Sequence, residues 1–179
     1  MLKIATTGLM LIALLSCCVI TIDVNRLSPY YTGVDTKAAP YVNEWLSLAK
    51  ERGFKFNHEV TVGFKEIDKG NTIGLTHYGI GWREIDLSTE YWSHATETAK
   101  TSLLWHELCH AYCFRRHDYG ADKKYNDGEG MQTVVHKGLG FFDDGCPVSI
   151  MFPVMTADIC FVRHYGNYTA EMFDRCNPY

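Results

Sequence analysis

The chain has 179 residues, of which 46% are hydrophobic and 21% charged, and its formal net charge is -4. This length fits one ordinary domain, and the aromatic content of 13% excludes an intrinsically disordered chain. Because 21 acidic residues outnumber 17 basic ones, we expect no basic surface for nucleic acid.

The N-terminus combines one early positive charge with an apolar run. Lys3 precedes a long uncharged stretch that is most apolar over Leu9–Leu15, an order typical of a secretory signal peptide. The string Leu14-Leu15-Ser16-Cys17 also resembles the bacterial lipobox, in which the cysteine is lipidated and becomes the new N-terminus. We therefore expect residues 1–16 to be a lipoprotein signal. A plain signal peptide and an uncleaved anchor are the alternatives, and both also export the protein.

A polar tether is predicted to follow the signal. Residues 17–39 contain Ser-Pro and Thr-Gly turn signals and form the expected linker to a domain at 40–179. A lipid on Cys17 would hold this domain at the membrane, so we expect an exported, membrane-anchored protein of the cell envelope rather than a freely secreted one. Disulfides are permitted in such an oxidising compartment.

The first predicted helix opens the domain. Pro40 suits a first helical turn, and the segment ends at Gly53. Within it, apolar residues recur at helical spacing, namely Val42, Trp45, Leu46 and Ala49. This pattern predicts a helix that packs one face against a core.

Between His58 and Ser88 the hydrophobic period becomes alternating. Three alternating runs, marked by Val60/Val62/Phe64, Ile73/Leu75 and Ile85/Leu87, are separated by turn signals at residues 68–71 and 79–81. We predict three short strands in meander order, paired antiparallel.

A second helix, capped by Ser93 or Thr96, carries the most informative segment of the chain. His106 and His110 are four residues apart, so both imidazoles project from one helix face. Two such nitrogens can bind one Zn²⁺. Glu107 would lie beside the open coordination position, where a carboxylate can accept a proton from an activated water. The motif therefore predicts a zinc site with Glu107 as general base.

A catalytic zinc usually has three protein ligands, so a third must follow. His117 is the nearest candidate, seven residues after His110. Asp118, Glu129 and His136 are the alternatives. Glycines on both sides of Glu129 disfavour its placement on a helix.

Two motifs together resemble a known clan. The stretch His106-Glu107-Leu108-Cys109-His110 followed by His117-Asp118 resembles the metzincin clan of zinc peptidases. The later stretch Cys146-Pro147-Val148-Ser149-Ile150-Met151-Phe152-Pro153 resembles the Met-turn of that clan, the tight turn beneath the metal. The pair is also similar to small metallopeptidases of bacteria and phages with an HExxHx6H motif. The resemblance covers roughly residues 58–173.

The resemblance implies an α+β fold, a small metzincin-like zinc-peptidase domain. It would comprise a backing helix, a short and mainly antiparallel sheet, an active-site helix, and an irregular C-terminal part with the Met-turn and a C-terminal helix. It implies that His106, His110 and His117 bind one catalytic Zn²⁺ and that Glu107 is the general base. Met151 would support the ligands without binding the metal, and an edge strand would hold the substrate by β-augmentation.

The sequence departs from the clan at two positions. The third histidine of the clan lies where Arg116 stands here, and Cys113 replaces the turn glycine. A non-glycine residue in a left-handed turn costs about 1 kcal/mol or more. We therefore expect the helix to run one residue longer and turn near Phe114, which would explain the position of His117.

Five of the seven cysteines lie in the last 71 residues, beginning with Cys109. Cys146 and Cys160 bracket the predicted Met-turn, and a disulfide between them would contribute about 3 kcal/mol. Cys176 is the other candidate partner for Cys160, because connectivity cannot be deduced from sequence. Cys113 shares the ligand face of the helix; burial as a small apolar residue is the preferred interpretation, and a metal-binding thiolate is the alternative.

These observations predict a zinc-dependent endopeptidase that acts on protein or peptide substrates. One alternative is a non-catalytic exported lipoprotein that uses zinc structurally as a binding module, which a fourth ligand such as Cys113 would favour. Another is a zinc peptidase of a different clan with Glu129 as third ligand. The presence of Glu107 favours the enzyme, since a structural zinc site has no use for a base there.

Overall fold

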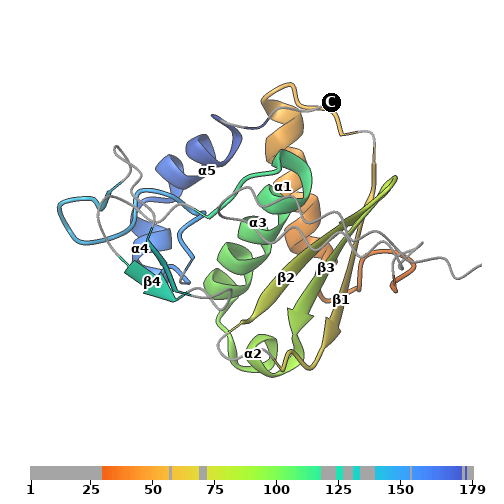
Figure 1. Ribbon diagram of the computed structural model, residues 1–179. Helices are drawn as coiled ribbons and strands as arrows, with labels where there is room; N and C mark the ends of the chain where they lie inside the picture. Colours follow the sequence, from red (N-terminus) through yellow and green to blue (C-terminus); the bar gives the residue numbers. More distant parts are fainter. Residues whose placement is uncertain are drawn as a thin grey trace, which may run out of the picture.

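The structure, a computed structural model, describes residues 30–56, 58–68, 72–117, 140–153, 155–174 and 176, and the backbone alone of 124–126 and 131–133. Its elements in chain order are α1 (Ala39–Glu51), β1 (Val60–Lys65), β2 (Gly74–Gly79), β3 (Trp82–Ser88), α2 (Thr89–His94), α3 (Glu97–Cys113), β4 (Lys124–Asn126), β5 (Met131–Thr133), α4 (Asp158–Arg163) and α5 (Tyr165–Asp174) (Figure 1). The predicted α+β class is confirmed.

The main sheet has the strand order β1-β3-β2. β1 pairs with β3 in parallel, and β2 pairs with β3 in antiparallel register. The predicted antiparallel meander is therefore wrong for β1, whose neighbour is the third strand and not the second. Alternating apolar residues identify the two faces of a strand, but they do not determine which strand lies beside it.

A tight turn at Ile80 and Gly81 joins β2 to β3. Gly81 has a φ of +80°, a backbone conformation that residues other than glycine rarely adopt. The turn sets the register in which Thr76 lies opposite Ile85. Successive side chains of a strand point to opposite faces, so Gly74, Thr76 and Tyr78 share the face that lies toward α3.

Helix α1 is the predicted backing helix, with Pro40 in its first turn. Val42, Trp45 and Ala49 are buried as the helical spacing predicted. The ring of Trp45 stacks on that of Tyr112 in α3, with centroids 5.4 Å apart. The aromatic contact and the buried residues of α1 stabilise the packing of α1 against α3.

Helix α3 lies at the centre of the molecule. It begins after Thr96, whose Oγ1 accepts a hydrogen bond from the Ala99 N–H at 3.0 Å, so Thr96 is the N-cap. The helix contacts β2 and β3 on one side and α1, α4 and α5 on others (Figure 1). Leu104, Trp105 and Leu108 are fully buried. Surrounded in this way, α3 offers a rigid support for the side chains at its C-terminal end.

Part of the predicted tether packs against the sheet. Val34 forms a parallel bridge with Val62 of β1, and the Asp35 N–H donates to the Val62 carbonyl at 2.9 Å. The ring of Tyr31 covers Gly63, where a Cβ atom would clash with it. Tyr31, Val34 and Asp35 of the predicted tether therefore contact the folded domain. The predicted signal 1–16 and Cys17 lie outside the described residues.

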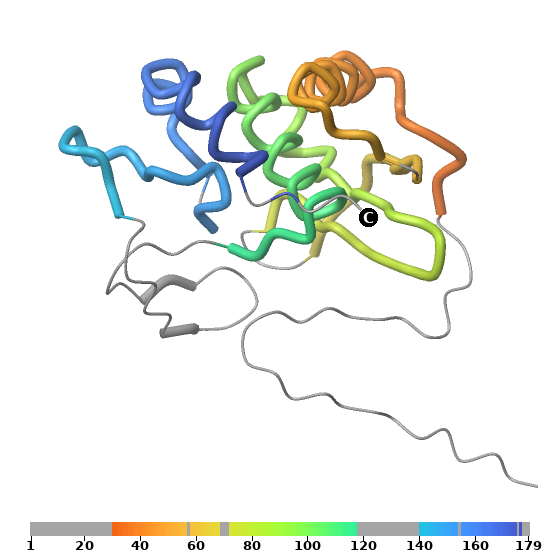
Figure 2. The backbone as a smooth tube through the Cα atoms, turned by 90° about the horizontal axis from the view of Figure 1, so that it is seen from above, coloured from red at the N-terminus to blue at the C-terminus, as the bar shows by residue number. Residues whose placement is uncertain are grey.

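Residues 140–153 and 155–174 lie mainly on the side of α3 away from α1 (Figure 2). Disulfides join Cys146 to Cys160 and Cys113 to Cys176. Cys176 is therefore the partner of Cys113 and not of Cys160, and the second disulfide links the end of α3 to the chain after α5. None of the helices in the described ranges is long and apolar enough to cross a membrane.

Candidate metal centre

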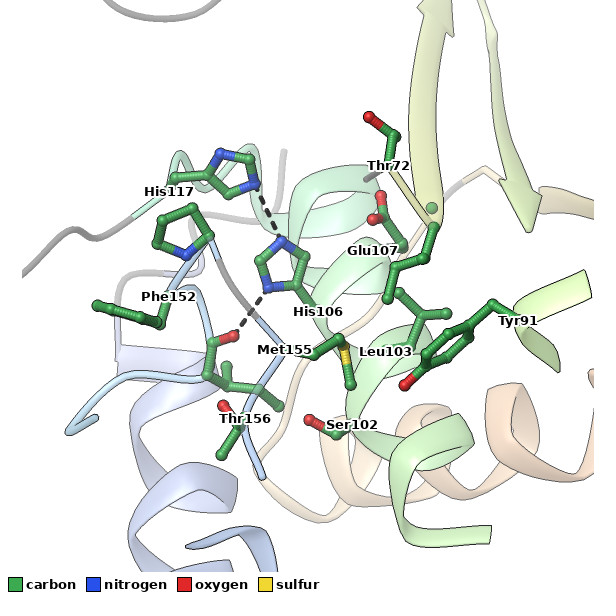
Figure 3. A pocket seen from close by; sticks show the side chains of 14 residues that line it. Thr72, Tyr91, Ser102, Leu103, His106, Glu107, His117, Phe152, Met155 and Thr156 are labelled. Atoms are coloured by element: carbon green, nitrogen blue, oxygen red, sulfur yellow. Dashed lines mark hydrogen bonds between the residues drawn. The ribbon is translucent and has the colours of Figure 1, made fainter. Parts of the chain in front are cut away.

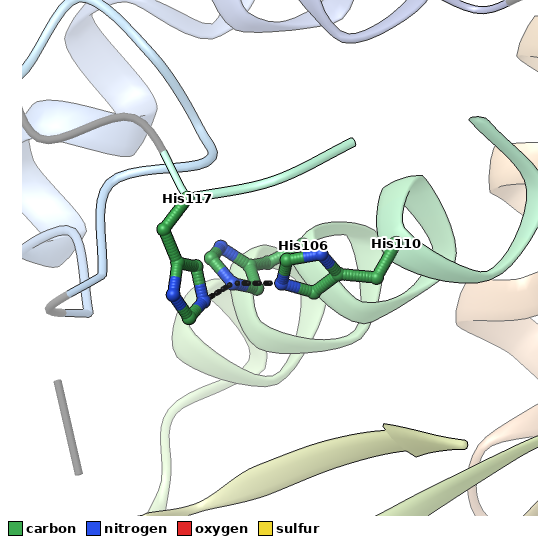
Figure 4. A group of neighbouring side chains, drawn as sticks. All are labelled: His106, His110 and His117. Atoms are coloured by element: carbon green, nitrogen blue, oxygen red, sulfur yellow. Dashed lines mark hydrogen bonds between the residues drawn. The ribbon is translucent and has the colours of Figure 1, made fainter. Parts of the chain in front are cut away.

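Three histidines bring their ring nitrogens together (Figure 4). His106 and His110 come from successive turns of α3, and His117 follows the helix. Nε2 of His106 lies 3.0 Å from Nε2 of His110 and 3.1 Å from Nε2 of His117. These are the three residues expected as metal ligands, and the fold places them around one point.

The left-handed residue at the end of α3 places His117 in this group. The helix continues through Cys113, and Phe114 has a φ of +52°. The Phe114 N–H donates to the His110 carbonyl at 3.2 Å, and the Arg115 N–H donates to the Cys109 carbonyl at 3.3 Å. This closes the helix as a C-terminal cap does. The expected turn near Phe114 is confirmed.

Two backbone carbonyls orient the helix histidines. Nδ1 of His106 lies 2.8 Å from the Ile150 carbonyl oxygen, and Nδ1 of His110 lies 2.5 Å from that of Arg115. A carbonyl only accepts, so each Nδ1 carries the proton and each Nε2 presents a lone pair. Two lone pairs 3.0 Å apart repel each other unless a cation lies between them.

The spacing of these nitrogens fits zinc. Zn–N bonds of about 2.0–2.1 Å in a tetrahedral arrangement place the nitrogens about 3.3 Å apart. The observed separations of 3.0 and 3.1 Å are close to this value. The donor set of three imidazole nitrogens is one that zinc accepts while keeping a fourth position for a substrate or water.

The protonation of the three histidines agrees with a ligand role. Burial, with a smaller contribution from a neighbouring imidazole, lowers the pKa of each of His106, His110 and His117 to about 3. The rings are therefore neutral near pH 7. A neutral imidazole is the form that coordinates a metal.

Glu107 lies beside the histidines, on the side facing the edge strand β2. Its side chain is buried, and Oε2 accepts a hydrogen bond from the Thr76 hydroxyl at 2.6 Å. Gly74 approaches the same carboxylate so closely that a Cβ there would lie 2.6 Å from Oε1. Sequence reasoning missed Thr76 and Gly74, because it followed the apolar residues of this strand. The signal that could have found Thr76 is a polar residue at an inward position.

A pocket of about 270 Å³ opens next to His106, Glu107 and His117 (Figure 3). Its remaining lining is mainly apolar and consists of Thr72, Ile73, Gly74, Tyr91, Ser102, Leu103, Ile150, Phe152, Pro153, Met155 and Thr156. We call it the apolar pocket. Its position beside the candidate metal site is suited to a side chain of a bound ligand.

The motif resembling a Met-turn forms a tight turn over residues 149–152. The Phe152 N–H donates to the Ser149 carbonyl at 3.3 Å, and the Met151 N–H donates to the Ser149 hydroxyl at 3.1 Å. Met151 is fully buried. The carbonyl that orients His106 belongs to Ile150, a residue that the sequence analysis did not single out.

Other candidate ligands have different outcomes. Asp118, Glu129 and His136 lie outside the described residues. Cys113 is joined to Cys176, so its sulfur is not available as a thiolate ligand, and the proposed fourth protein ligand is not supported.

The conserved-family comparison identifies the histidine-bearing part of the chain. The model of the SprT-like family matches residues 42–137, which is more than half of the chain and includes most of α1, the main sheet, α3 and the three clustered histidines. No curated protein and no solved structure matches the chain.

Proposed function

The chain belongs to the SprT-like family, which is zinc-metallopeptidase-like, and we propose that it is a zinc-dependent endopeptidase with His106, His110 and His117 as ligands. The observation that carries the proposal is the convergence of three neutral imidazoles beside a buried carboxylate, with Nε2 of His106 lying 3.0 Å from Nε2 of His110 and 3.1 Å from Nε2 of His117.

The chemistry follows from these positions. Zn²⁺ bound there would polarise the scissile carbonyl and lower the pKa of a water molecule. Glu107 would accept the proton of that water and pass it to the leaving amine. The hydrogen bond from Thr76 holds the Glu107 carboxylate in one orientation, so little reorganisation is needed when the proton moves.

The substrate would be a protein or peptide in extended conformation. β2 lies at one edge of the main sheet among the described strands, on the side of the candidate site. An extended peptide pairing with that edge would run past Glu107. The apolar pocket next to Glu107 would then receive a side chain adjoining the scissile bond, which favours an apolar residue there.

The proposed location is outside the cytoplasm, with the domain held at the membrane through Cys17. Two disulfides, Cys113–Cys176 and Cys146–Cys160, support this proposal because disulfides persist in oxidising compartments. Mass spectrometry of the N-terminal peptide of the mature protein tests it. A lipid-modified Cys17 is expected, and an unprocessed N-terminus at Met1 would contradict it.

The decisive test of the enzyme proposal is Glu107→Gln. This variant is expected to bind one zinc per chain, as the parent does, and to hydrolyse peptides at least about 100-fold more slowly. Glu97→Gln, in the first turn of the same helix, is the matched control and should leave both properties unchanged. Cleavage of a peptide library by Glu107→Gln at the parent rate would contradict the proposed role of Glu107 as general base.

Measurements on the parent protein and on a His117 variant separate the alternatives. A parent protein that binds one zinc yet cleaves no peptide in the library would favour the non-catalytic binding module. Zinc stoichiometry that survives His117→Ala would favour a different third ligand, such as Glu129.

A further inference from the structure

The carbonyls that orient the two helix histidines belong to segments far apart in the chain. The Arg115 carbonyl, facing His110, follows α3, and the Ile150 carbonyl, facing His106, lies in the turn over residues 149–152. Both Arg115 and Ile150 also contact one side chain, the carboxylate of Glu171 in α5.

The two carboxylate oxygens of Glu171 contact the two segments separately, since Oε1 contacts Arg115 and Oε2 contacts Ile150. Oε1 pairs with the Arg115 guanidinium and accepts a hydrogen bond from the Ser149 hydroxyl at 3.0 Å. Oε2 accepts the Ile150 N–H at 3.3 Å. Arg115 is held a second time, because its Nη1 donates to the Glu171 backbone carbonyl at 3.1 Å.

These contacts lie away from solvent. The side chains of Arg115 and Glu171 are 4% and 18% exposed. Charge-assisted hydrogen bonds are stronger and more directional in such surroundings than on the surface. A single half-buried carboxylate therefore connects both residues whose carbonyls set the orientation of a candidate zinc ligand.

We propose that Glu171 is a positioning residue for the metal centre. By holding Arg115 and Ile150, its carboxylate fixes the carbonyls that receive the Nδ1 protons of His110 and His106, and so keeps both Nε2 lone pairs directed at one point. This inference rests on the proposed function, since it takes these imidazoles to be zinc ligands. Such outer partners of ligating histidines set the tautomer and the ring orientation.

The attachment of α5 does not depend on Glu171 alone. The chain just after α5 is joined to α3 by the disulfide Cys113–Cys176, and Tyr168, Met172 and Phe173 are buried in the core. Loss of the carboxylate is thus expected to loosen the two carbonyls while the helix stays in place.

Glu171→Gln tests the proposal in the full protein. The amide replaces one acceptor oxygen by a donor, so it must face either the Ile150 N–H or the donors of Arg115 and Ser149, and contacts on that side are lost. We expect zinc affinity, measured by competition with a chromophoric chelator, to fall about 10- to 100-fold. The visible absorption spectrum of the Co²⁺-loaded protein should also change, because it reports ligand geometry.

Asp86→Asn is the matched control. Asp86 is a fully buried carboxylate with its own partners, Lys65 and His77, on the face of β3 opposite to Ile85 and the helices. This variant should lose thermal stability but keep the zinc affinity and the Co²⁺ spectrum of the parent. A structural role alone would make Glu171→Gln behave in the same way.

The outcomes are distinct. Parent-like zinc affinity and an unchanged Co²⁺ spectrum in Glu171→Gln overturn the inference. A parent protein that binds no zinc overturns the proposed function as well. If Glu171→Gln fails to fold, Ser149→Ala decides the matter, since it removes one donor to the carboxylate: weaker zinc binding supports the inference, and unaltered binding contradicts it.

Discussion

The hydroxyl of Thr76 donates a hydrogen bond to Oε2 of Glu107 at 2.6 Å and thereby links the edge strand β2 to the histidine-bearing helix α3. The strand that would bind a substrate and the carboxylate that would act as base are thus in direct contact. Substitutions of Thr76 and Gly74, which contact Glu107, should therefore affect catalysis without affecting the metal.

Thr76→Val should lower kcat about 10-fold, because valine keeps the shape of threonine but lacks the hydroxyl that donates to Glu107, an interaction worth about 1–2 kcal/mol to the position of the carboxylate. Steady-state kinetics and zinc stoichiometry would check it. Thr61→Val is the control, since the Thr61 hydroxyl donates to the Arg83 carbonyl in the sheet. An equal loss of activity in both variants would mean that Thr76 acts only through sheet stability.

Gly74→Ala should displace the Glu107 carboxylate, because the new Cβ would lie 2.6 Å from Oε1. The end of a flexible side chain can move aside, so we expect little change in the free energy of unfolding but a clear loss of kcat. Gly166→Ala, where a Cβ meets nothing within 4 Å, is the control. Unchanged peptide hydrolysis by Gly74→Ala would contradict the assignment of Glu107 as base.

Met155→Ala should enlarge the apolar pocket and shift cleavage toward peptides with a larger apolar side chain next to the scissile bond. Comparison of kcat/KM across a peptide series, with a single position varied, measures this shift. Ile159→Ala, on an exposed side chain of α4, should leave the preference unchanged. A uniform loss across the series would argue that the pocket does not bind the substrate.

Asp86 should make stability depend on pH. Burial alone would raise the pKa of this carboxyl, but hydrogen bonds from His77 and Lys65 outweigh burial and lower it. A carboxyl with a lowered folded-state pKa stabilises the protein above its unfolded-state pKa of about 3.9, and this stability is lost as pH falls through the folded-state value. Urea unfolding should therefore show that the free energy of unfolding falls less between pH 7 and pH 3 in Asp86→Asn than in the parent. Identical pH profiles of the two proteins would contradict this prediction.

The two disulfides should contribute unequally to stability. Cys113–Cys176 spans 63 residues and Cys146–Cys160 spans 14. Because loop-closure entropy grows with loop length, removing the first should cost about 4 kcal/mol of unfolding free energy and removing the second about 3 kcal/mol. Urea unfolding of the double serine variants of each pair measures the difference, and a larger loss from the shorter loop would contradict this account.

Local physics made several features predictable from the sequence alone. The four-residue spacing of His106 and His110 places them on one helix face, and the cap at Thr96 is a local hydrogen bond. The length of α3 followed from Cys113 in place of glycine, which moves the left-handed residue to Phe114. The catalytic role of Glu107 stays a prediction until activity is measured.

Other features depend on which distant segments meet, and only the tertiary structure decided them. The parallel pairing of β1 with β3, the disulfide Cys113–Cys176 and the contact of Thr76 with Glu107 each join residues between 20 and 65 positions apart. Glu171 reaches Arg115 across 56 positions. Periodicity and spacing describe the surroundings of a residue along its own helix or strand, whereas these contacts depend on how the helices and strands pack, and that packing is a property of the whole chain.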